Sequence, residues 1–309
     1  MRIIRSVLNS ANLLFAAAIA AGFFFPQARH IGEFLILPSL TIILTVTLLR
    51  FPRGFFRPPA SLIPGAAWSN VMTYLVLGNL IILGSLFVIL DEILWIGMVL
   101  AAAVPPAITI IPLSRMMKTD PKWTFSGLAG AHLGALLITP VIVLAFFRHI
   151  PVQPDKIILL VLALIVLPLL LSRVAVDKDR DVFIERYESD ITDICFFLIF
   201  YTLTASNREH IREWPAEITV IGVIAFSVIA VIAAGVKAIG WFFKISPPRI
   251  SFFLLSGTLK NYGLAGGVAL VVFAPAAALP PLIFSVLTVF YVTILKIIYD
   301  RPTPPDNDQ

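Results

Sequence analysis

Runs of apolar residues long enough to cross a membrane recur from one end of this chain to the other. Crossing about 30 Å of hydrocarbon takes a helix of about 20 mainly apolar residues. Because 59% of the residues are hydrophobic and only 13% are charged, a soluble globular domain is excluded, and the sequence predicts an all-α polytopic membrane protein. The ten predicted spans are residues 8–25, 32–49, 65–88, 93–114, 123–147, 157–172, 190–206, 216–241, 250–274 and 277–298.

Basic residues are distributed unevenly between the two predicted sides of the membrane. Of the 23 lysine and arginine residues, 17 fall on the side that carries both chain ends and 5 fall on the opposite side. Short loops rich in these residues stay in the cytoplasm. We therefore expect a multi-pass protein of the inner (plasma) membrane with both termini in the cytoplasm and the lipid bilayer as a partner. The net charge of +5 follows from this topology and needs no nucleic-acid partner.

Two of the ten spans are interrupted in the middle by helix-breaking residues. The fourth carries Pro105 and Pro106, and the ninth carries the glycine-rich stretch 256–267; the offset from Pro105 to Gly257 is 152 residues, about half of the chain. Non-helical backbone at membrane depth is tolerated only where it is buried in protein or lines a wet cavity. The pattern predicts two inverted five-helix repeats, residues 1–150 and 151–299, whose broken fourth and ninth helices cross. A cytoplasmic tail, residues 300–309, follows.

Lys260 is the one basic residue that this topology places deep in the membrane. A charge at that depth costs several kcal/mol, so it marks a functional site by default. Its ammonium could attract an anionic substrate or exchange a proton during transport. Alternatively, it could bind backbone carbonyls that the break frees. No Asp or Glu lies deep in any predicted span, so an acidic partner is not expected.

Further polar residues inside the spans are candidates for the same site. His132 could relay protons or line a pocket, or it could be a hydrogen-bonded packing residue. Asn70 could line the cavity or bond one helix to another. Asp190 and Asp193 are expected at the N-terminus of the seventh helix, after a cytoplasmic connector. The predicted substrate-binding residues are Lys260, Asn261, Ser256, Thr258, His132, Thr109, Thr124 and Asn70.

Motifs for catalysis and cofactors are largely missing. The sequence has no paired-carboxylate site, no Cys/His metal spacing and no phosphate-binding glycine loop, so we expect neither an enzyme nor a cofactor. Two distant alternatives stay open. One is an intramembrane enzyme in which Ser256 and Lys260, at i and i+4, form a dyad. The other is a receptor that keeps the fold without transporting.

Two segments resemble the bile acid:sodium symporter family. Residues 104–120, continuing to 136–140, are similar to the family's fourth and fifth helices, where a Pro-Gly-Gly-Thr-Ala-Ser-Asn-like break precedes a Leu-Leu-Thr-Pro-like helix end. Residues 260–265 (Lys-Asn-Tyr-Gly-Leu-Ala) resemble its ninth-helix Gln-Asn-x-Gly-Leu-Ala. Residues 64–70, at the start of the third span, offer a rival position for the first break. The resemblance implies a secondary transporter of bile acids or other organic anions that works by alternating access.

The chain departs from this family where the family binds sodium. The family's Ser-Asn pair falls on Ile110 and Ile111, its ninth-helix Glu on Ser256 and its Gln on Lys260, while Thr124 matches one fifth-helix hydroxyl. A hard cation needs oxygen ligands, and an ammonium at the same place would repel it. We therefore expect an organic-anion transporter that is not coupled to sodium, with proton coupling as one option. The alternative is the sodium-coupled symport typical of the family.

Overall fold

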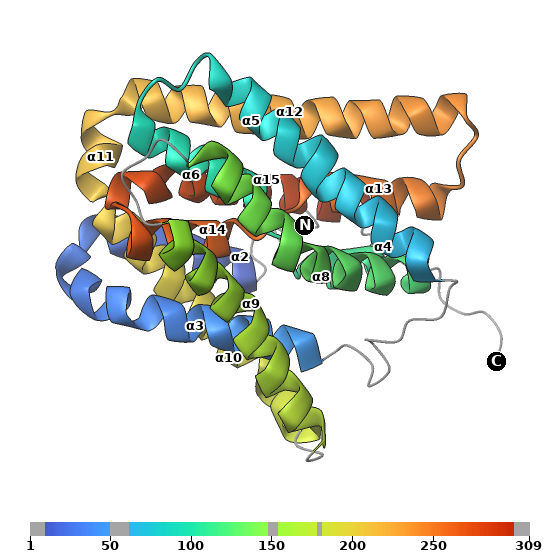
Figure 1. The fold of residues 1–309 in the computed structure, drawn as a ribbon, viewed down its shortest axis with the longest axis horizontal. Coiled ribbons are helices and arrows are strands. Elements are labelled where there is room, and N and C mark those ends of the chain that lie inside the picture. Colours follow the sequence, from blue (N-terminus) through green and yellow to red (C-terminus); the bar gives the residue numbers. More distant parts are fainter. Residues whose placement is uncertain (1–9, 50–61, 148–153, 178–180, 300–309) are drawn as a thin grey trace.

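The computed structural model describes residues 10–49, 62–147, 154–177 and 181–299, which form helices joined by short links and contain no strand (Figure 1). The predicted tail, residues 300–309, lies outside the described residues. In chain order the elements are α2 (Ser10–Phe24), η1 (Pro26–Ala28), α3 (Arg29–Leu49), α4 (Ile63–Asn70), η3 (Val71–Gly78), α5 (Asn79–Leu86), α6 (Glu92–Ala103), α7 (Ile110–Met116), α8 (Pro121–Phe146), α9 (Pro154–Asp177), α10 (Asp181–Ser206), α11 (Arg208–Glu213), α12 (Pro215–Phe242), α13 (Pro247–Thr258), α14 (Tyr262–Val272), η4 (Pro275–Ala278) and α15 (Leu279–Tyr299).

Several helices have the length and surface that a membrane requires. Within the described residues, five segments are long and apolar enough to cross one: Pro26–Val46, Ile63–Leu86, Pro121–Phe146, Pro215–Phe242 and Pro275–Tyr299. Large apolar side chains on α12, among them Val223, Phe226 and Ile239, are more than half exposed. Such a surface suits contact with hydrocarbon rather than with water. The prediction of a helical chain with several helices long and apolar enough to cross a membrane is confirmed.

Local chemistry explains where many helices begin. Proline lacks the N–H that a first helical turn leaves unpaired, and its fixed φ angle suits that position. Asp91 caps α6 by accepting a hydrogen bond of 2.8 Å from the backbone N–H of Leu94. The described α-helices that begin with proline are α8, α9, α12 and α13, at Pro121, Pro154, Pro215 and Pro247.

The connector predicted between the sixth and seventh spans is largely helical. α9 continues to Asp177 and α10 begins at Asp181. Asp190 and Asp193 therefore lie more than two turns inside α10, and the prediction that they occupy a helix N-terminus is wrong. An apolar run marks the part of a helix that suits a membrane, whereas the helix itself continues through charged residues of good helical propensity.

The two predicted interruptions are confirmed. α6 ends at Ala103 and α7 begins at Ile110, which leaves residues 104–109 as the first break. α13 ends at Thr258 and α14 begins at Tyr262, which leaves residues 259–261 as the second break. The rival position at residues 64–70 is wrong, because α4 continues through it.

The two breaks lie against each other as a short antiparallel pair. The backbone N–H of Asn261 donates to the carbonyl oxygen of Pro105 at 2.9 Å, and that of Ala107 donates to the carbonyl oxygen of Leu259 at 3.2 Å. Backbone groups that have no partner within a helix are thus hydrogen-bonded to residues far away in the sequence. This is how irregular backbone can persist at membrane depth.

The third predicted span is one continuous helix whose middle is wider than an α-helix. α4 passes into the π-helix η3 and then into α5. η3 lies directly against the end of α6: a Cβ atom at Gly78 would come within 3.0 Å of the carbonyl oxygen of Ala102. This is tighter than an ordinary van der Waals contact, so glycine suits the close approach of η3 to α6. π-helical turns are rare and occur often at functional sites.

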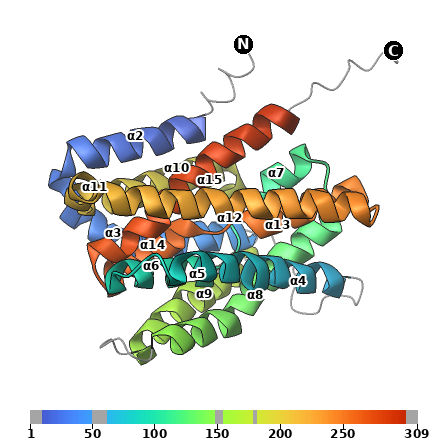
Figure 2. The ribbon, with the colours of Figure 1, turned by 90° about the horizontal axis from the view of Figure 1, so that it is seen from above.

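The helices fall into two sets that pack against each other. α10 packs against α2 and α3, and α3 packs against α9, so these four form one set, which we call the four-helix set. The remaining helices surround the two breaks; among them, α12 runs along the length of the molecule and contacts α5 (Figures 1 and 2). α6 and α14, the helices beside the breaks, are buried on nearly all sides. The links α2–α3, α5–α6 and α14–α15 lie at one end of the molecule, and the link α12–α13 lies at the other (Figure 1).

Candidate functional site

Lys260 is buried where the two breaks meet, with 2% of its surface exposed. Its ammonium donates hydrogen bonds to the carbonyl oxygens of Ala102 and Val104, the second at 3.0 Å. It also lies 4.8 Å from the centroid of the Tyr74 ring, on η3. No carboxylate among the described residues forms an ion pair with it. The structure thus places the charge on freed backbone carbonyls, as the alternative hypothesis for this residue expected.

Two further carbonyls at the first break also have donors. The hydroxyl of Thr139, on α8, donates to the carbonyl oxygen of Ala103 at 2.7 Å. The next free carbonyl, that of Pro105, accepts from the backbone of Asn261. Because the helix ends at Ala103, these oxygens have lost the N–H groups that a continuing helix would supply. Lys260, Thr139 and the second break together replace those lost donors.

The remaining polar groups of the second break hold its helices in shape. The side-chain oxygen of Asn261 accepts from the backbone N–H of Leu264 at 3.1 Å and so caps α14. The hydroxyl of Thr258 donates to the carbonyl oxygen of Leu254, and the hydroxyl of Thr73 on η3 donates to that of Ser256. Since α13 ends at Thr258, the regular i, i+4 spacing assumed for a dyad of Ser256 with Lys260 is interrupted.

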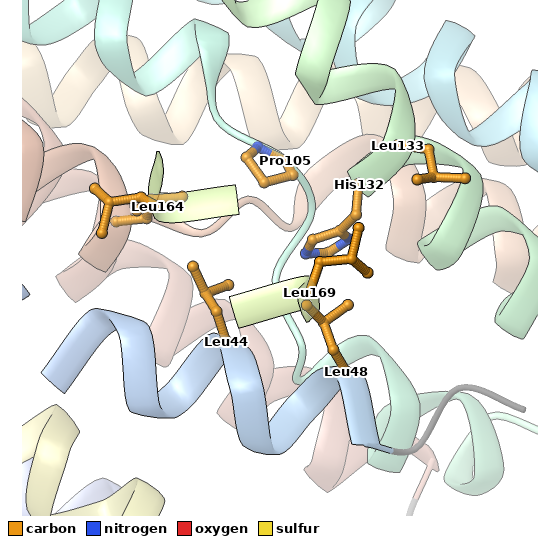
Figure 3. A pocket seen from close by; sticks show the side chains of 8 residues that line it. Leu44, Leu48, Pro105, His132, Leu133, Leu164 and Leu169 are labelled. Carbon is orange, nitrogen blue, oxygen red and sulfur yellow. The ribbon is translucent and has the colours of Figure 1, made fainter. Parts of the chain in front are cut away.

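His132 faces a small cavity between the four-helix set and the first break (Figure 3). The cavity measures about 20 Å³, which is room for about one water molecule. Nδ1 of His132 lies 2.8 Å from the carbonyl oxygen of Leu128, whereas Nε2 is buried without a partner. The other lining residues are Leu44, Leu48, Pro105, Leu133, Leu164, Leu169 and Leu264.

The geometry fixes which nitrogen of His132 carries a proton. A carbonyl oxygen can only accept, so Nδ1 must be the donor. Nε2 is then a lone pair in the neutral ring and a second N–H donor in the charged ring. Because the other described residues of the wall are leucine and proline, His132 is the one titratable side chain among them.

Two of the predicted site residues lie away from the breaks, and a third is exposed to the surface. Thr109 is the last residue of the first break and is exposed at the start of α7. Thr124 lies in the first turn of α8, where its hydroxyl is 2.6 Å from that of Thr119. Asn70 donates from its amide to the carbonyl oxygen of Gly130 at 3.1 Å and joins α4 to α8, which is the helix-to-helix bond considered for it. The structure therefore gathers Lys260, Asn261, Ser256 and Thr258 at the breaks, with His132 at the neighbouring cavity.

The sequence analysis missed two residues of this site. Thr139 and Tyr74 both hold the end of α6, one through its hydroxyl and the other through its ring. Both are polar side chains inside apolar spans. The hydroxyl of Tyr74 is also used, donating to the carbonyl oxygen of Ala131 at 2.9 Å. The position of Thr139 and Tyr74 inside apolar spans could have identified both residues from the sequence, because a polar group in hydrocarbon needs a partner.

The positions that the resemblance aligns with sodium ligands, Ile110 and Ile111, have apolar surroundings. Ile110 and Ile111 are buried among apolar side chains of α7, α8 and α13. Within the described residues, no group of three His, Cys, Asp or Glu side chains could hold a metal. No protein-family model and no curated protein matches this chain. What the chain does has to be inferred from its own residues and their geometry.

Proposed function

We propose that this protein is a secondary active transporter that carries a small organic anion across the inner membrane by alternating access. One observation carries the proposal: two helices interrupted in mid-course meet through backbone hydrogen bonds and enclose the amino group of Lys260. Interrupted helices that meet near the midplane form the substrate and ion sites of many secondary transporters. We also infer ten passes in two inverted halves, 1–150 and 151–299, with both termini in the cytoplasm.

The packing of the helices supports an inverted repeat. In such a repeat α2, α3, the continuous helix α4–η3–α5, α6, α7 and α8 correspond in order to α9, α10, α12, α13, α14 and α15. Contacts in one half should then have counterparts in the other. α4 packs against α8, and its counterpart α12 packs against α15. α7 packs against α8 as α14 does against α15, and α3 against α9 as α10 does against α2. The paired breaks in α6–α7 and α13–α14 fit the same correspondence.

The cavity beside His132 is the proposed substrate site. Its walls come from both sets: Leu44 and Leu164 belong to the four-helix set, and Pro105 and His132 belong to the other helices. Apolar walls with one polar atom suit an anion that has an apolar body. Since the cavity has room for about one water molecule, the substrate would enter only after the two sets move apart, and such opening and closing is what alternating access requires.

Electrostatics favour an anion at this place. The charge of Lys260 has no carboxylate partner among the described residues, and Pro105 both lines the cavity and bonds to Asn261, the neighbour of Lys260. In a medium of low dielectric constant an uncompensated charge acts over a longer distance than it does in water. An anion in the cavity would therefore be attracted from across the first break.

Binding of an anion at His132 would also bind a proton. The neutral ring presents a lone pair at Nε2, which a carboxylate cannot use, whereas the charged ring presents an N–H. The proposed cycle therefore takes up the anion together with a proton on His132. Sodium has no evident place in it, because Ile110 and Ile111 supply no oxygen and Lys260 brings a positive charge.

The experiment that tests transport begins with a thermal-shift screen of organic carboxylates on the purified protein, since a substrate that binds the folded state raises its melting temperature. The best compound is then measured for uptake into proteoliposomes, with an inward proton gradient and without one. We expect saturable uptake that the gradient accelerates. Liposomes that contain His132→Leu protein are the matched control.

The same measurements distinguish the alternatives. Uptake that requires sodium would favour the sodium-coupled symport typical of the resembling family. A compound that stabilises the protein but never crosses the membrane would indicate a receptor, and one that is converted chemically would indicate an enzyme. The absence of both stabilisation and uptake across bile acids, aromatic acids and short aliphatic acids would contradict the proposal.

A further inference from the structure

The end of α6 forms a three-sided cage around the ammonium of Lys260. Two sides are the carbonyl oxygens of Ala102 and Val104, and the third is the face of the Tyr74 ring. An ammonium has three N–H donors. The two carbonyls take two of them, and the ring lies on the remaining side.

Each side of this cage attracts positive charge for its own reason. Carbonyl oxygens at a helix C-terminus carry the negative end of the helix dipole. The face of an aromatic ring attracts a cation within about 6 Å of its centroid. The cage is also rigid, because the hydroxyl of Tyr74 is bonded to Ala131 and the neighbouring carbonyl of Ala103 is bonded to Thr139. It is therefore a cation site that is built from other residues than Lys260.

The chemistry of the cage selects an ammonium rather than a metal ion. Hard metal cations take a shell of several oxygen ligands. Two carbonyl oxygens and a ring face fall short of such a shell, but they match the donors of a primary ammonium. The four-carbon stem of Lys260 occupies the approach to the cage, so a free ligand with a similar stem would fit in its place.

We propose that the cage is a binding site for a primary alkylammonium ion and that Lys260 is its tethered ligand. The chain carries its own cation at the crossing, and this cation holds the end of α6 to the second break. If the side chain of Lys260 is cut back to a methyl group, the site is vacated and takes up a free alkylammonium from solution. The inference goes beyond the proposed function, because the site would exist whether or not the protein transports an anion.

The test is chemical rescue of Lys260→Ala in the purified protein. We expect a lower melting temperature than that of the unaltered protein, and a saturable increase when n-butylammonium chloride is added. Sodium chloride and potassium chloride at equal concentrations should not produce it, and neither should 1-butanol, which has the stem without the charge. Lys260→Met is the matched control, because its side chain fills the space and should prevent rescue.

The rescue has outcomes that would overturn the proposal. An equal effect of butylammonium on Lys260→Ala, Lys260→Met and the unaltered protein would show that the compound acts on the detergent or the surface. A stable Lys260→Ala protein that butylammonium leaves unchanged would show that the carbonyls and the ring form no cation site.

A second measurement keeps the proposal testable if Lys260→Ala does not fold. Tyr74→Phe is prepared, followed by phenylalanines with one, two and three ring fluorines at the same position. Fluorination weakens the negative face of the ring with little change in shape, so the melting temperature should fall stepwise along the series. The same series in Lys260→Met protein should show no such trend. If the melting temperature does not change along the series in the lysine-containing protein, the ring does not contribute to the site, and the cage as proposed is overturned.

Discussion

The hydroxyl of Thr139 donates a hydrogen bond of 2.7 Å to the carbonyl oxygen of Ala103, the last residue of α6. Both residues are buried, and the acceptor belongs to a helix that stops there because residue 104 is extended. A buried carbonyl without a donor is unfavourable by about 1–3 kcal/mol. A threonine on α8 thus stabilises a break in a different helix.

Thr139→Val should lower the free energy of unfolding by about 1–3 kcal/mol, because it keeps the shape of the side chain and leaves the carbonyl of Ala103 unpaired. Thermal or denaturant unfolding in detergent would measure the difference. Thr204→Val is the matched control: Thr204 is equally buried, but its hydroxyl bonds to Phe200 within its own helix. An equal or larger loss in Thr204→Val would show that the carbonyl at the break has no special need of Thr139.

Replacing His132 should separate binding from stability. His132→Leu removes a buried nitrogen that has no partner, so the melting temperature should stay the same or rise, while anion binding falls at least tenfold. In the unaltered protein the charged ring binds the anion, so affinity should increase as the pH falls. His132→Gln offers an N–H donor at every pH and should keep part of the affinity but lose its pH dependence. Affinity measured by calorimetry across a pH series checks all three proteins, and an unchanged pH profile in His132→Gln would rule out the assigned role.

Sodium should be dispensable. The resemblance aligns Ile110, Ile111 and Lys260 with oxygen-bearing side chains of the symporter family. If this alignment holds, replacing sodium by potassium at fixed pH should leave binding and uptake nearly unchanged. Uptake into proteoliposomes in matched salts is the measurement. A saturable dependence on sodium of several-fold would show that another part of the chain supplies the ligands.

The two ends of α12 should be accessible from opposite sides of the membrane. In a Cys195→Ser background, which removes the one native cysteine, Glu213→Cys should react with an impermeant thiol reagent added to intact cells. Lys244→Cys, beyond the other end of α12, should react only after the membrane is opened. Both replaced residues are exposed in the folded chain, so burial does not confound the comparison. Labelling of both positions from outside would contradict the predicted topology.

The features that the sequence predicted are those with a local cause. Apolar runs predicted where helices lie, and Pro105 and Pro106 predicted the first break because proline cannot continue a helix. The crossing could be anticipated from the half-chain spacing of the breaks, and the structure shows it as the bond from Asn261 to Pro105. The start of α10 could not be placed, because its first residues are charged and lie outside any apolar run.

The groups that contact the Lys260 side chain could not be predicted from the sequence, for a different reason. The burial of the ammonium follows from its depth in an apolar run, but the choice of the carbonyls of Ala102 and Val104 depends on how two distant segments align. The ring of Tyr74 reaches the same point only because η3 packs against the end of α6. Such relationships arise from three-dimensional packing, and no local pattern of residues predicts them.

The width of η3 determines which neighbouring residues can work together. Backbone bonds in a π-helix run from i to i+5, so each turn holds roughly one more residue than an α-turn and successive side chains diverge by a smaller angle. Thr73 and Tyr74 are consecutive, yet one bonds to Ser256 of α13 and the other covers the ammonium of Lys260. Relative to a regular α-helix, η3 therefore contains one inserted residue. Deleting one residue between 71 and 78 would let the turn close as an ordinary α-helix, and the chain would lose the position where a single helix contacts the end of α6, α13 and Lys260 of the second break.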